Sequence, residues 1–356
     1  MLSEYFPNQT PYSNSATLFR VHRKHGEVFA LCPVSGPVDW ERLLPAQSRK
    51  ARVYRWMAGL ARRLGIQFPR ETIEIAWSPD NPLLSLEKIS RHPRLPGLIL
   101  PGNPHGIAPR LVIICPDEKG RPSSAIKAGH LNPARELIQK ERTFLASLRS
   151  TVFEQLAPRL LGELETSRVS AFATEFVEGP CPPSGSSNSL GRFLALMIDT
   201  RRLRPLLELA PWEKIFPRDL PSDRMFQKHG QKIVHPCIFH GDFAPWNIRI
   251  TPDGTWKAID WERGCLDGIP GWDWFHFILQ PAILVKKWKA GRVIELGRQT
   301  ITSPDFLTYL DEAVPDAGKN GFAEFLLRSY LLYNWHVLQP TERREVHQSL
   351  AEWALS

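Results

Sequence analysis

The sequence predicts an α+β protein in two parts, an antiparallel sheet with one helix followed by a mainly helical part. Between about residues 95 and 178, short apolar runs alternate with turn signals and are interrupted by one longer run of helical period. Beyond residue 189 most apolar runs have helical spacing instead. The length of 356 residues is also typical of two domains.

Composition restricts the class of protein. With 42% hydrophobic and 23% charged residues, the chain is an ordinary globular protein and not a disordered or collagen-like one. Its 5 cysteines stand far apart without a C-x-x-C pair, which argues against a disulfide framework or a zinc knuckle. The first residues do not resemble a secretory signal, and no apolar run is long enough to span a membrane. We therefore expect a cytoplasmic protein.

Residues 1–94 predict a basic N-terminal extension, a hairpin at 17–32 followed by a helix ending near Gly65. Residues 1–95 hold 14 Lys and Arg against 8 Asp and Glu, which is +6 of the net charge of +8. Five apolar residues of the helix recur at helical spacing, namely Val53, Trp56, Met57, Leu60 and Leu64. Two interpretations stay open: a packed helix with a solvated basic face, or a helix that docks on an anionic membrane or partner.

Residues 95–179 predict a small lobe of five strands and one helix. Three closely spaced strand candidates lie at 95–100, 110–115 and 123–128, with a turn signal at 117–120. Asn132-Pro133 then marks the start of a helix, and two further strand candidates at 160–166 and 169–176 follow it. The Pro- and Ser-rich run at 180–189 is a composition break, so we place the domain boundary near Gly179.

Residues 180–356 predict the helical part, with helices at about 275–290, 321–338 and 342–354. The exception is the segment 237–261, which predicts a loop, a strand, a Pro-Asp-Gly turn and a second strand.

The strongest local signal is His240-Gly241-Asp242, followed after four residues by Asn247 and later by Asp260. This spacing matches the kinase catalytic loop, in which an Asp meets the acceptor hydroxyl while an Asn and a later Asp hold magnesium. The chemistry explains the pattern, because phosphoryl transfer needs positioned metal ligands beside the polyphosphate and one carboxylate beside the incoming oxygen.

With Gly after the His, the motif resembles the aminoglycoside phosphotransferase and choline kinase family. The resemblance implies a bilobal protein-kinase-like fold and the use of ATP and Mg²⁺. It implies that Asp242 is the catalytic base and that Asn247 and Asp260 are the magnesium ligands. It further implies that Asp273 braces the catalytic loop. We expect His240 to order this loop as well, without exchanging protons.

The same resemblance implies a nucleotide site in the first lobe. Lys127, at the end of the third strand, would hold the α- and β-phosphates, and Glu141 in the next helix would pair with it. The segment after the fifth strand resembles the hinge whose backbone meets adenine, with Glu175, Phe176 and Val177.

Three departures from the family pattern are visible. Residues 101–109, PGNPHGIAP, are not a G-x-G-x-x-G loop, and no motif explains residues 1–94. Ala244 stands two residues after Asp242, where protein Ser/Thr kinases have a lysine, which favours a small-molecule acceptor over a protein.

The sequence gives less information about the acceptor molecule than about the catalytic loop. Residues 274–356 contain nine acidic and nine basic residues, so no acidic pocket for a cationic aminoglycoside is indicated. Nine of the 12 tryptophans lie from Trp212 onward. They suit sugar rings or quaternary ammonium groups, or they form a tryptophan-rich core. A sugar, polyol or amino-alcohol hydroxyl is our first expectation, and the basic N-terminal segment is compatible with a lipid-linked glycan or peripheral membrane contact.

The leading hypothesis is an ATP- and Mg²⁺-dependent phosphotransferase acting on a small-molecule hydroxyl. The alternative is a catalytically silent kinase-like nucleotide-binding or scaffold module, favoured by the irregular glycine loop and the unexplained residues 1–94. Nucleic-acid binding would rest on net charge alone, and we do not expect it.

Overall fold

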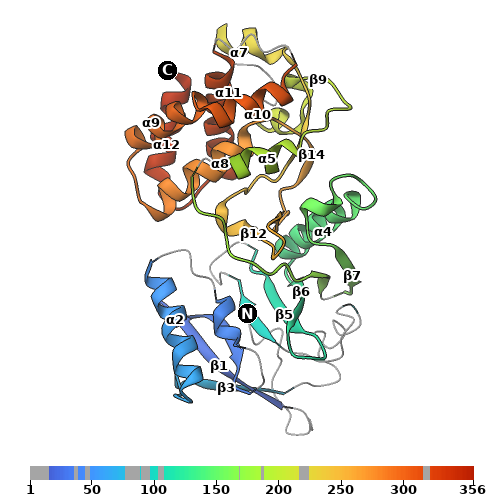
Figure 1. Cartoon of the computed structure of the whole chain (residues 1–356), viewed down its shortest axis with the longest axis vertical. Coiled ribbons are helices and arrows are strands. Elements are labelled where there is room, and N and C mark those ends of the chain that lie inside the picture. The colour runs from blue at the N-terminus through green and yellow to red at the C-terminus, as the bar shows by residue number, and fades with distance from the viewer. Residues whose placement is uncertain are drawn as a thin grey trace. The chain divides into compact units, whose positions relative to one another are not determined.

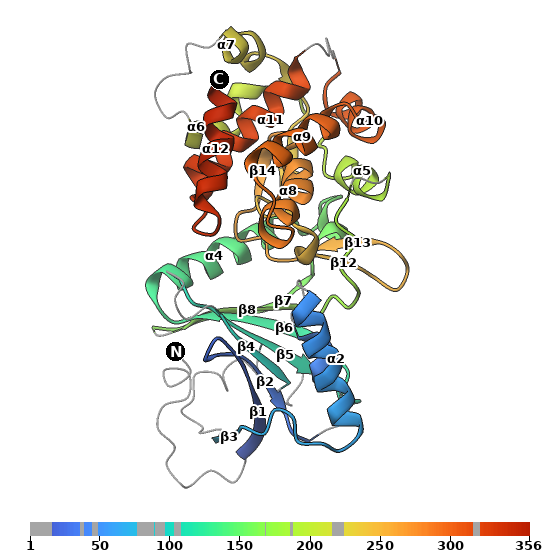
Figure 2. The same cartoon turned by 90° about the vertical axis from the view of Figure 1, so that its left-hand side faces the viewer.

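The protein divides into two compact units, Met1–Glu178 and Gly179–Ser356. The computed structural model describes residues 16–35, 39–44, 49–76, 89, 97–102, 108–167, 169–185, 188–215, 224–315 and 321–356. Figures 1 and 2 show that the first unit is built on a sheet and the second is mainly helical. The predicted α+β class is therefore confirmed.

Unit 1 contains one eight-stranded sheet in the order β3-β1-β2-β4-β5-β6-β8-β7, with neighbouring strands antiparallel. The strands are β1 (Ala16–Lys24), β2 (Glu27–Pro33), β3 (Thr72–Ala76), β4 (Leu98–Pro101), β5 (Leu111–Pro116), β6 (Pro122–Gly129), β7 (Leu160–Glu165) and β8 (Ser170–Glu175). The segment expected as a separate extension thus shares a sheet with the five strands of the lobe. The join is narrow, because β2 and β4 meet in the single register pair Leu31 with Ile99.

The alternation of side chains along each strand gives the sheet two apolar faces. Ile126 and Ala128 of β6 belong to the larger buried cluster, together with Leu31. Ala30, one residue earlier on β2, belongs to a second cluster that includes Trp40. Lys127 lies between Ile126 and Ala128, so it projects from the opposite face of the sheet to theirs. Its cross-strand neighbours in this register are Val112 of β5 and Phe172 of β8.

Two helices of unit 1 pack beside the sheet (Figure 2). Helix α4 (Asn132–Ser147) follows β6 and lies on β6 and β8 through buried residues that include Ile138 and Leu145. Helix α2 (Arg49–Arg63) follows the 3₁₀ turn η1 (Trp40–Leu43) and packs against it. A second 3₁₀ turn, η3, spans Glu154–Leu156.

The face of α2 that packs inward is not the apolar stripe of the sequence. Ala58 and Ala61 are buried, and the hydroxyl of Tyr54 contacts His22 Nδ1 at 3.0 Å. The large apolar residues of the stripe are exposed instead, from Leu60 at 39% to Trp56 at 66%. Helix α2 is packed, but the prediction that its apolar stripe is the buried face is wrong.

A buried ion cluster fixes α2 to the sheet. Glu41 of η1 has no solvent exposure, and its Oε1 accepts a hydrogen bond from Arg20 of β1 at 2.9 Å. Arg62 of α2 lies 3.5 Å from its Oε2. One carboxylate therefore links a strand, a 3₁₀ turn and a helix.

In its described residues, unit 2 is mainly helical with three short antiparallel ladders, β9 with β10, β11 with β14 and β12 with β13. Its strands are β9 (Arg204–Pro205), β10 (Ile233–Val234), β11 (Cys237–Phe239), β12 (Ile248–Ile250), β13 (Trp256–Ala258) and β14 (Cys265–Gly268). Its helices are α5 (Asn188–Ala195), α6 (Ala210–Ile215), α7 (Arg224–Gly230), α8 (Trp272–Gln280), α9 (Ala290–Ile301), α10 (Pro304–Ala313), α11 (Phe322–Tyr333) and α12 (Arg344–Leu355). The 3₁₀ turns η4 (Leu206–Glu208) and η5 (Pro245–Asn247) and the π-helical turns η6 (Pro281–Val285) and η7 (Asn334–Leu338) complete it.

Helix α8 is the central helix of unit 2, since all nine of its residues are buried. It packs against α11, α9 and α5. In the part of the chain that the structure describes, no helix is both long and apolar enough to cross a bilayer.

The ion cluster at Glu41 predicts that removing this carboxylate costs far more stability than removing the exposed carboxylate of Glu71. Glu41→Ala leaves Arg20 and Arg62 without their buried partner and should destabilise the unit by about 3 kcal/mol in urea unfolding followed by circular dichroism. Glu71→Ala removes an exposed pair with Arg23 at 2.7 Å and is the matched control, for which little change is expected. Equal losses in the two variants would contradict the role assigned to Glu41.

Candidate active site

The predicted catalytic loop lies between β11 and the β12–β13 hairpin of unit 2. In this hairpin Ile248 pairs with Ala258, so the residues just outside it, Asn247 and Ile259, are also neighbours. The backbone N–H of Ile259 donates to the carbonyl of Asn247 at 2.8 Å. The hairpin therefore brings Asn247 close to the residue that precedes Asp260.

Gly241 is required by the turn that follows β11. Its φ is +77°, a left-handed conformation that side chains other than hydrogen rarely adopt. A Cβ at this position would also lie 2.8 Å from Cβ of Arg263. Glycine thus allows the chain to turn directly before Asp242.

Asp273, in the first turn of α8, accepts hydrogen bonds from this loop. Its two carboxylate oxygens bind the backbone amides of His240 at 2.7 Å and of Gly241 at 3.1 Å. Burial raises the pKa of Asp273 to about 7, against the lowering effect of the same two hydrogen bonds. Asp273 therefore joins the start of α8 to the backbone of residues 240 and 241.

His240 connects the loop to the strand that leads to Asp260. Its Nδ1 accepts the backbone N–H of Asp242 at 3.2 Å, so its Nε2 carries the proton and donates to the carbonyl of Ile259 at 2.9 Å. The ring is fully buried, with its centroid 4.5 Å from that of Trp261. Burial lowers the pKa of His240 to about 4, which keeps the imidazole neutral.

Asp242 and Asn247 are in direct contact. The amide nitrogen of Asn247 donates to the backbone carbonyl of Asp242 at 2.9 Å and to its carboxylate Oδ2 at 3.0 Å. Both bonds use Nδ2, so the side-chain oxygen of Asn247 is the atom that can bind a metal ion.

His276 also belongs to this site, although its spacing in the sequence gives no sign of a functional role. Its Nε2 lies 3.0 Å from Oδ1 of Asp242, and its Nδ1 lies 3.2 Å from the hydroxyl of Tyr330. Asn334 donates to the same hydroxyl at 3.1 Å. An ionised carboxylate only accepts, so Nε2–H donates to Asp242, and the Tyr330 hydroxyl then donates to Nδ1. The network fixes both the ring and its tautomer.

The pKa of Asp242 results from opposed effects. Burial raises it, while the hydrogen bond from His276 lowers it, with a smaller lowering effect from the charge of Arg263. The net effect is a pKa below the usual value for aspartate. Asp242 is therefore an ionised carboxylate at neutral pH, with each oxygen held by a named donor.

Asp260 stands two residues beyond β13 in a left-handed conformation, with φ of +72°. Aspartate adopts this conformation more readily than most other non-glycine residues. The amide oxygen of Asn247 and the carboxylate of Asp260 are hard oxygen donors, the type that Mg²⁺ prefers. The donor chemistry of these residues therefore fits magnesium.

Lys127 and Glu141 form an ion pair in unit 1. Lys127 Nζ lies 2.6 Å from Oε1 and 2.8 Å from Oε2 of Glu141, on α4. The side chain of Glu141 is buried, whereas that of Lys127 is 19% exposed. The structure therefore brings together the two residues that the family resemblance implied as partners.

The predicted hinge residues follow β8, but two of their amides are already occupied. The N–H of Glu175 donates to the carbonyl of Arg159, and that of Phe176 to the carbonyl of Ser123, each at 2.9 Å. Val177 is buried. Any contact of this segment with adenine must therefore use carbonyl groups or the amide of Val177.

Two further features of the sequence, the segment 101–109 and the tryptophans of unit 2, can be compared with the structure. The segment 101–109, which departs from the glycine-loop pattern of the family, falls largely on residues 103–107, and these lie outside the described residues. Of the tryptophans in unit 2, four are buried and belong to the core, namely Trp212, Trp261, Trp272 and Trp274. Trp246 and Trp256, close to the catalytic loop in sequence, are partly exposed.

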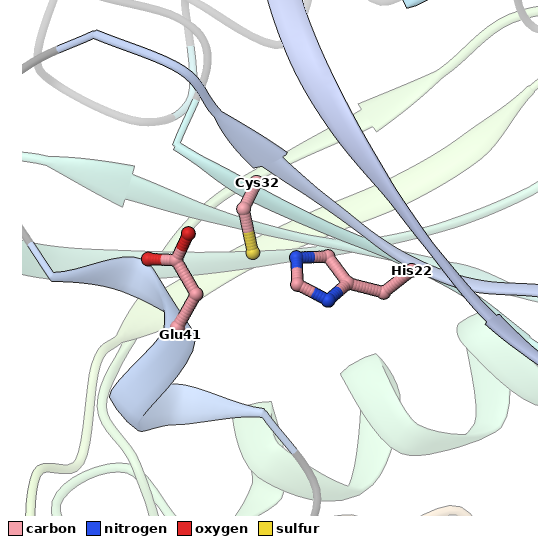
Figure 3. Close-up of side chains that lie close together, drawn as sticks. All are labelled: His22, Cys32 and Glu41. Carbon is pink, nitrogen blue, oxygen red and sulfur yellow. The ribbon is translucent and has the colours of Figure 1, made fainter. Parts of the chain in front are cut away.

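A second group of ligand-type side chains lies in unit 1. Donor atoms of His22, Cys32 and Glu41 are within 4.8 Å of one another and all three residues are buried (Figure 3). Glu41, however, is paired with Arg20 and Arg62, and burial raises the pKa of the Cys32 thiol well above its usual value. Two guanidinium groups beside a protonated thiol disfavour a divalent cation, so we interpret this group as structural.

The chain is similar to solved structures of small-molecule kinases. A choline kinase, LicA from Streptococcus pneumoniae, is 18% identical over 77% of this chain and 96% of its own, with a TM-score of 0.44. Aminoglycoside phosphotransferase APH(3'')-Id from Streptomyces rimosus is 15% identical over 72% of this chain and 92% of its own, with a TM-score of 0.35. No protein-family model and no curated protein sequence matches the chain. Identities and TM-scores this low say nothing about the substrate of this chain.

The buried neutral imidazole of His240 predicts acid sensitivity of unit 2. Because the folded protein binds fewer protons than the unfolded chain between about pH 6.5 and 4, stability is present above pH 6.5 and is lost as the pH falls to about 4. The contribution of His240 is on the order of 3 kcal/mol. Urea unfolding at a series of pH values should show a shallower decline in His240→Gln than in the wild type.

His25→Gln, in the exposed β1–β2 turn, is the control and should keep the wild-type slope. Burial also lowers the pKa values of His22 and His347 to about 4, so part of the decline persists in every variant. Identical slopes for His240→Gln and the wild type would show that His240 is not the group that titrates.

Proposed function

We propose that this chain is an ATP- and Mg²⁺-dependent phosphotransferase that moves the γ-phosphoryl group to a hydroxyl of a small molecule. The observation that carries the proposal is the loop at 240–247, in which the Asp242 carboxylate is held by Asn247 on one oxygen and by His276 on the other. A carboxylate fixed beside an amide ligand is what phosphoryl transfer to an alcohol requires.

Asp242 is the proposed general base. It accepts the proton of the acceptor hydroxyl while that oxygen forms its bond to the γ-phosphorus, and the bond from phosphorus to the β,γ-bridging oxygen breaks to release ADP. The hydrogen bond from His276 keeps the carboxylate ionised and oriented. A general base of this kind contributes roughly 10²–10⁴-fold to the rate.

Asn247, through Oδ1, and Asp260 are the proposed magnesium ligands. The metal would neutralise charge on the β- and γ-phosphate oxygens. The residues of this chain supply the orientation: the hairpin places Asn247 beside Ile259, and His240 binds the carbonyl of Ile259.

Unit 1 contributes the proposed nucleotide contacts. Lys127 would bind the α- and β-phosphates, and Glu141 holds its ammonium group in one position. Glu175, Phe176 and Val177 remain the proposed adenine segment, through their carbonyls and the Val177 amide.

The proposed acceptor is a neutral or zwitterionic alcohol such as a sugar, a polyol or an amino alcohol. The balanced acidic and basic residues of 274–356 argue against a polycation. Partly exposed Trp246, in the catalytic loop, offers an aromatic face for a sugar ring or an ammonium group.

The test is mass spectrometry of a metabolite extract incubated with ATP, Mg²⁺ and either the wild-type protein or Asp260→Ala. A metabolite that gains one phosphoryl group only with the wild type supports the proposal and identifies the acceptor class. Intact ATP and weak, metal-independent nucleotide binding would support the silent-module alternative instead.

Asp242→Asn separates catalysis from binding. The amide cannot accept the hydroxyl proton as a base, so kcat should fall by about 10²–10⁴-fold while the dissociation constant for ATP changes little. Asp253→Asn, in the exposed β12–β13 turn, is the matched control and should turn over at the wild-type rate. Unchanged turnover of Asp242→Asn would refute the assignment of the base.

His276→Leu tests the positioning of Asp242. Losing the donor raises the pKa of Asp242, so the acid limb of the pH profile of kcat should move to higher pH, with a several-fold lower plateau. Tyr330→Phe removes the hydroxyl that fixes the tautomer of His276 and should shift the limb less, in the same direction. An unmoved acid limb in both variants would mean that His276 serves stability alone.

A further inference from the structure

The exposed face of helix α2 is an apolar stripe. Its members recur at helical spacing and are Val53, Trp56, Met57, Leu60 and, in the turn that continues the helix, Leu64. Their side chains are between 39% and 66% exposed. Isolated exposed apolar residues are normal, but five on one helix face form a contiguous patch, which typically marks an interaction site.

The inward face of the same helix is already satisfied. Ala58 and Ala61 pack against the unit, and Arg62 binds Glu41 and the carbonyl of Pro33. The stripe is therefore not a core face that failed to pack, since the helix has a second face that holds it in place.

The charge of α2 is uniformly positive. Its 15 residues contain six Lys and Arg and no Asp or Glu. Of these, Lys50, Arg52 and Arg63 are exposed, and Arg63 is also 3.8 Å from Asp39. An exposed apolar stripe with a tryptophan, flanked by cations, is the pattern of a helix that lies in a membrane interface.

We propose that α2 docks unit 1 on an anionic lipid surface, with the five residues of the stripe inserted at the level of the headgroups and the flanking cations on lipid phosphates. Charge complementarity favours lipid over a second copy of the chain, because two copies of α2 would bring two sets of cations together. This site is independent of the proposed phosphotransferase activity.

The test is co-sedimentation of the full chain with two kinds of vesicle at about 0.1 M salt. One kind contains phosphatidylcholine alone, and the other also contains roughly 30–40% phosphatidylglycerol. Binding is expected to the anionic vesicles and to weaken at least tenfold at high salt or without anionic lipid. The double variant Trp56→Ser, Leu64→Ser should bind at least tenfold more weakly than the wild type, since it removes the two most exposed apolar side chains of the stripe.

The control is Val152→Ser with Leu355→Ser, which removes two apolar side chains of similar exposure elsewhere, 64% and 58% against 66% and 64%. This variant should bind as the wild type does. Circular dichroism should show that both double variants remain folded, because all four positions are exposed.

Two results would overturn the proposal. The first is no binding to anionic vesicles, or equal binding of the two double variants. The second is a wild-type dimer in sedimentation velocity that Trp56→Ser, Leu64→Ser converts to a monomer without any effect on vesicle binding, which would assign the stripe to self-association.

Discussion

Two hydrogen bonds from consecutive backbone amides to the carboxylate of Asp273 are the constraint on which the candidate active site depends. They hold the peptide units of His240 and Gly241 in a turn that glycine alone accommodates easily, with a φ of +77°. The turn directs the His240 ring inward, where it binds the carbonyl of Ile259. Asp242 and Asp260 therefore take their positions from one buried carboxylate, although 18 residues of sequence separate them.

The environment of Asp242 favours orientation over basicity. Burial raises the pKa of this carboxylate, but the hydrogen bond from His276 lowers it. The resulting lower pKa makes Asp242 a weaker base. In a loose phosphoryl-transfer transition state the acceptor hydroxyl loses its proton late, so a strong base is not needed. What the proposed reaction requires is a carboxylate that stays ionised and points in one direction, and donors on both oxygens from Asn247 and His276 provide this.

Local patterns in the sequence predicted much of this structure, whereas contacts between residues far apart in the sequence were not predicted. The strands on either side of Lys127, the helix that carries Glu141 and the motif from His240 to Asp260 are all encoded in short patterns. His276 was not identified, because it lies 34 residues from Asp242 and its partner Tyr330 lies 54 residues further on, so only the packing of α8 on α11 brings them together. For α2 the predicted helix is present, but the face predicted to be buried is exposed. Hydrophobic period defines the faces of a helix, whereas the buried face here is set by small residues such as Ala58 and by the ion pair of Arg62.

That ion pair also shows why net charge is a poor guide to the surface of α2. Six cations on one helix suggest a uniform basic face, yet Arg62 points inward and neutralises Glu41, and Arg55 binds the carbonyl of Leu44. The remaining exposed cations flank the apolar stripe instead of lying opposite it. In water the exposed stripe is unfavourable, because its apolar surface stays in contact with solvent. Next to an anionic interface the same arrangement is favourable twice, because apolar side chains leave water at the level where the cations meet phosphate.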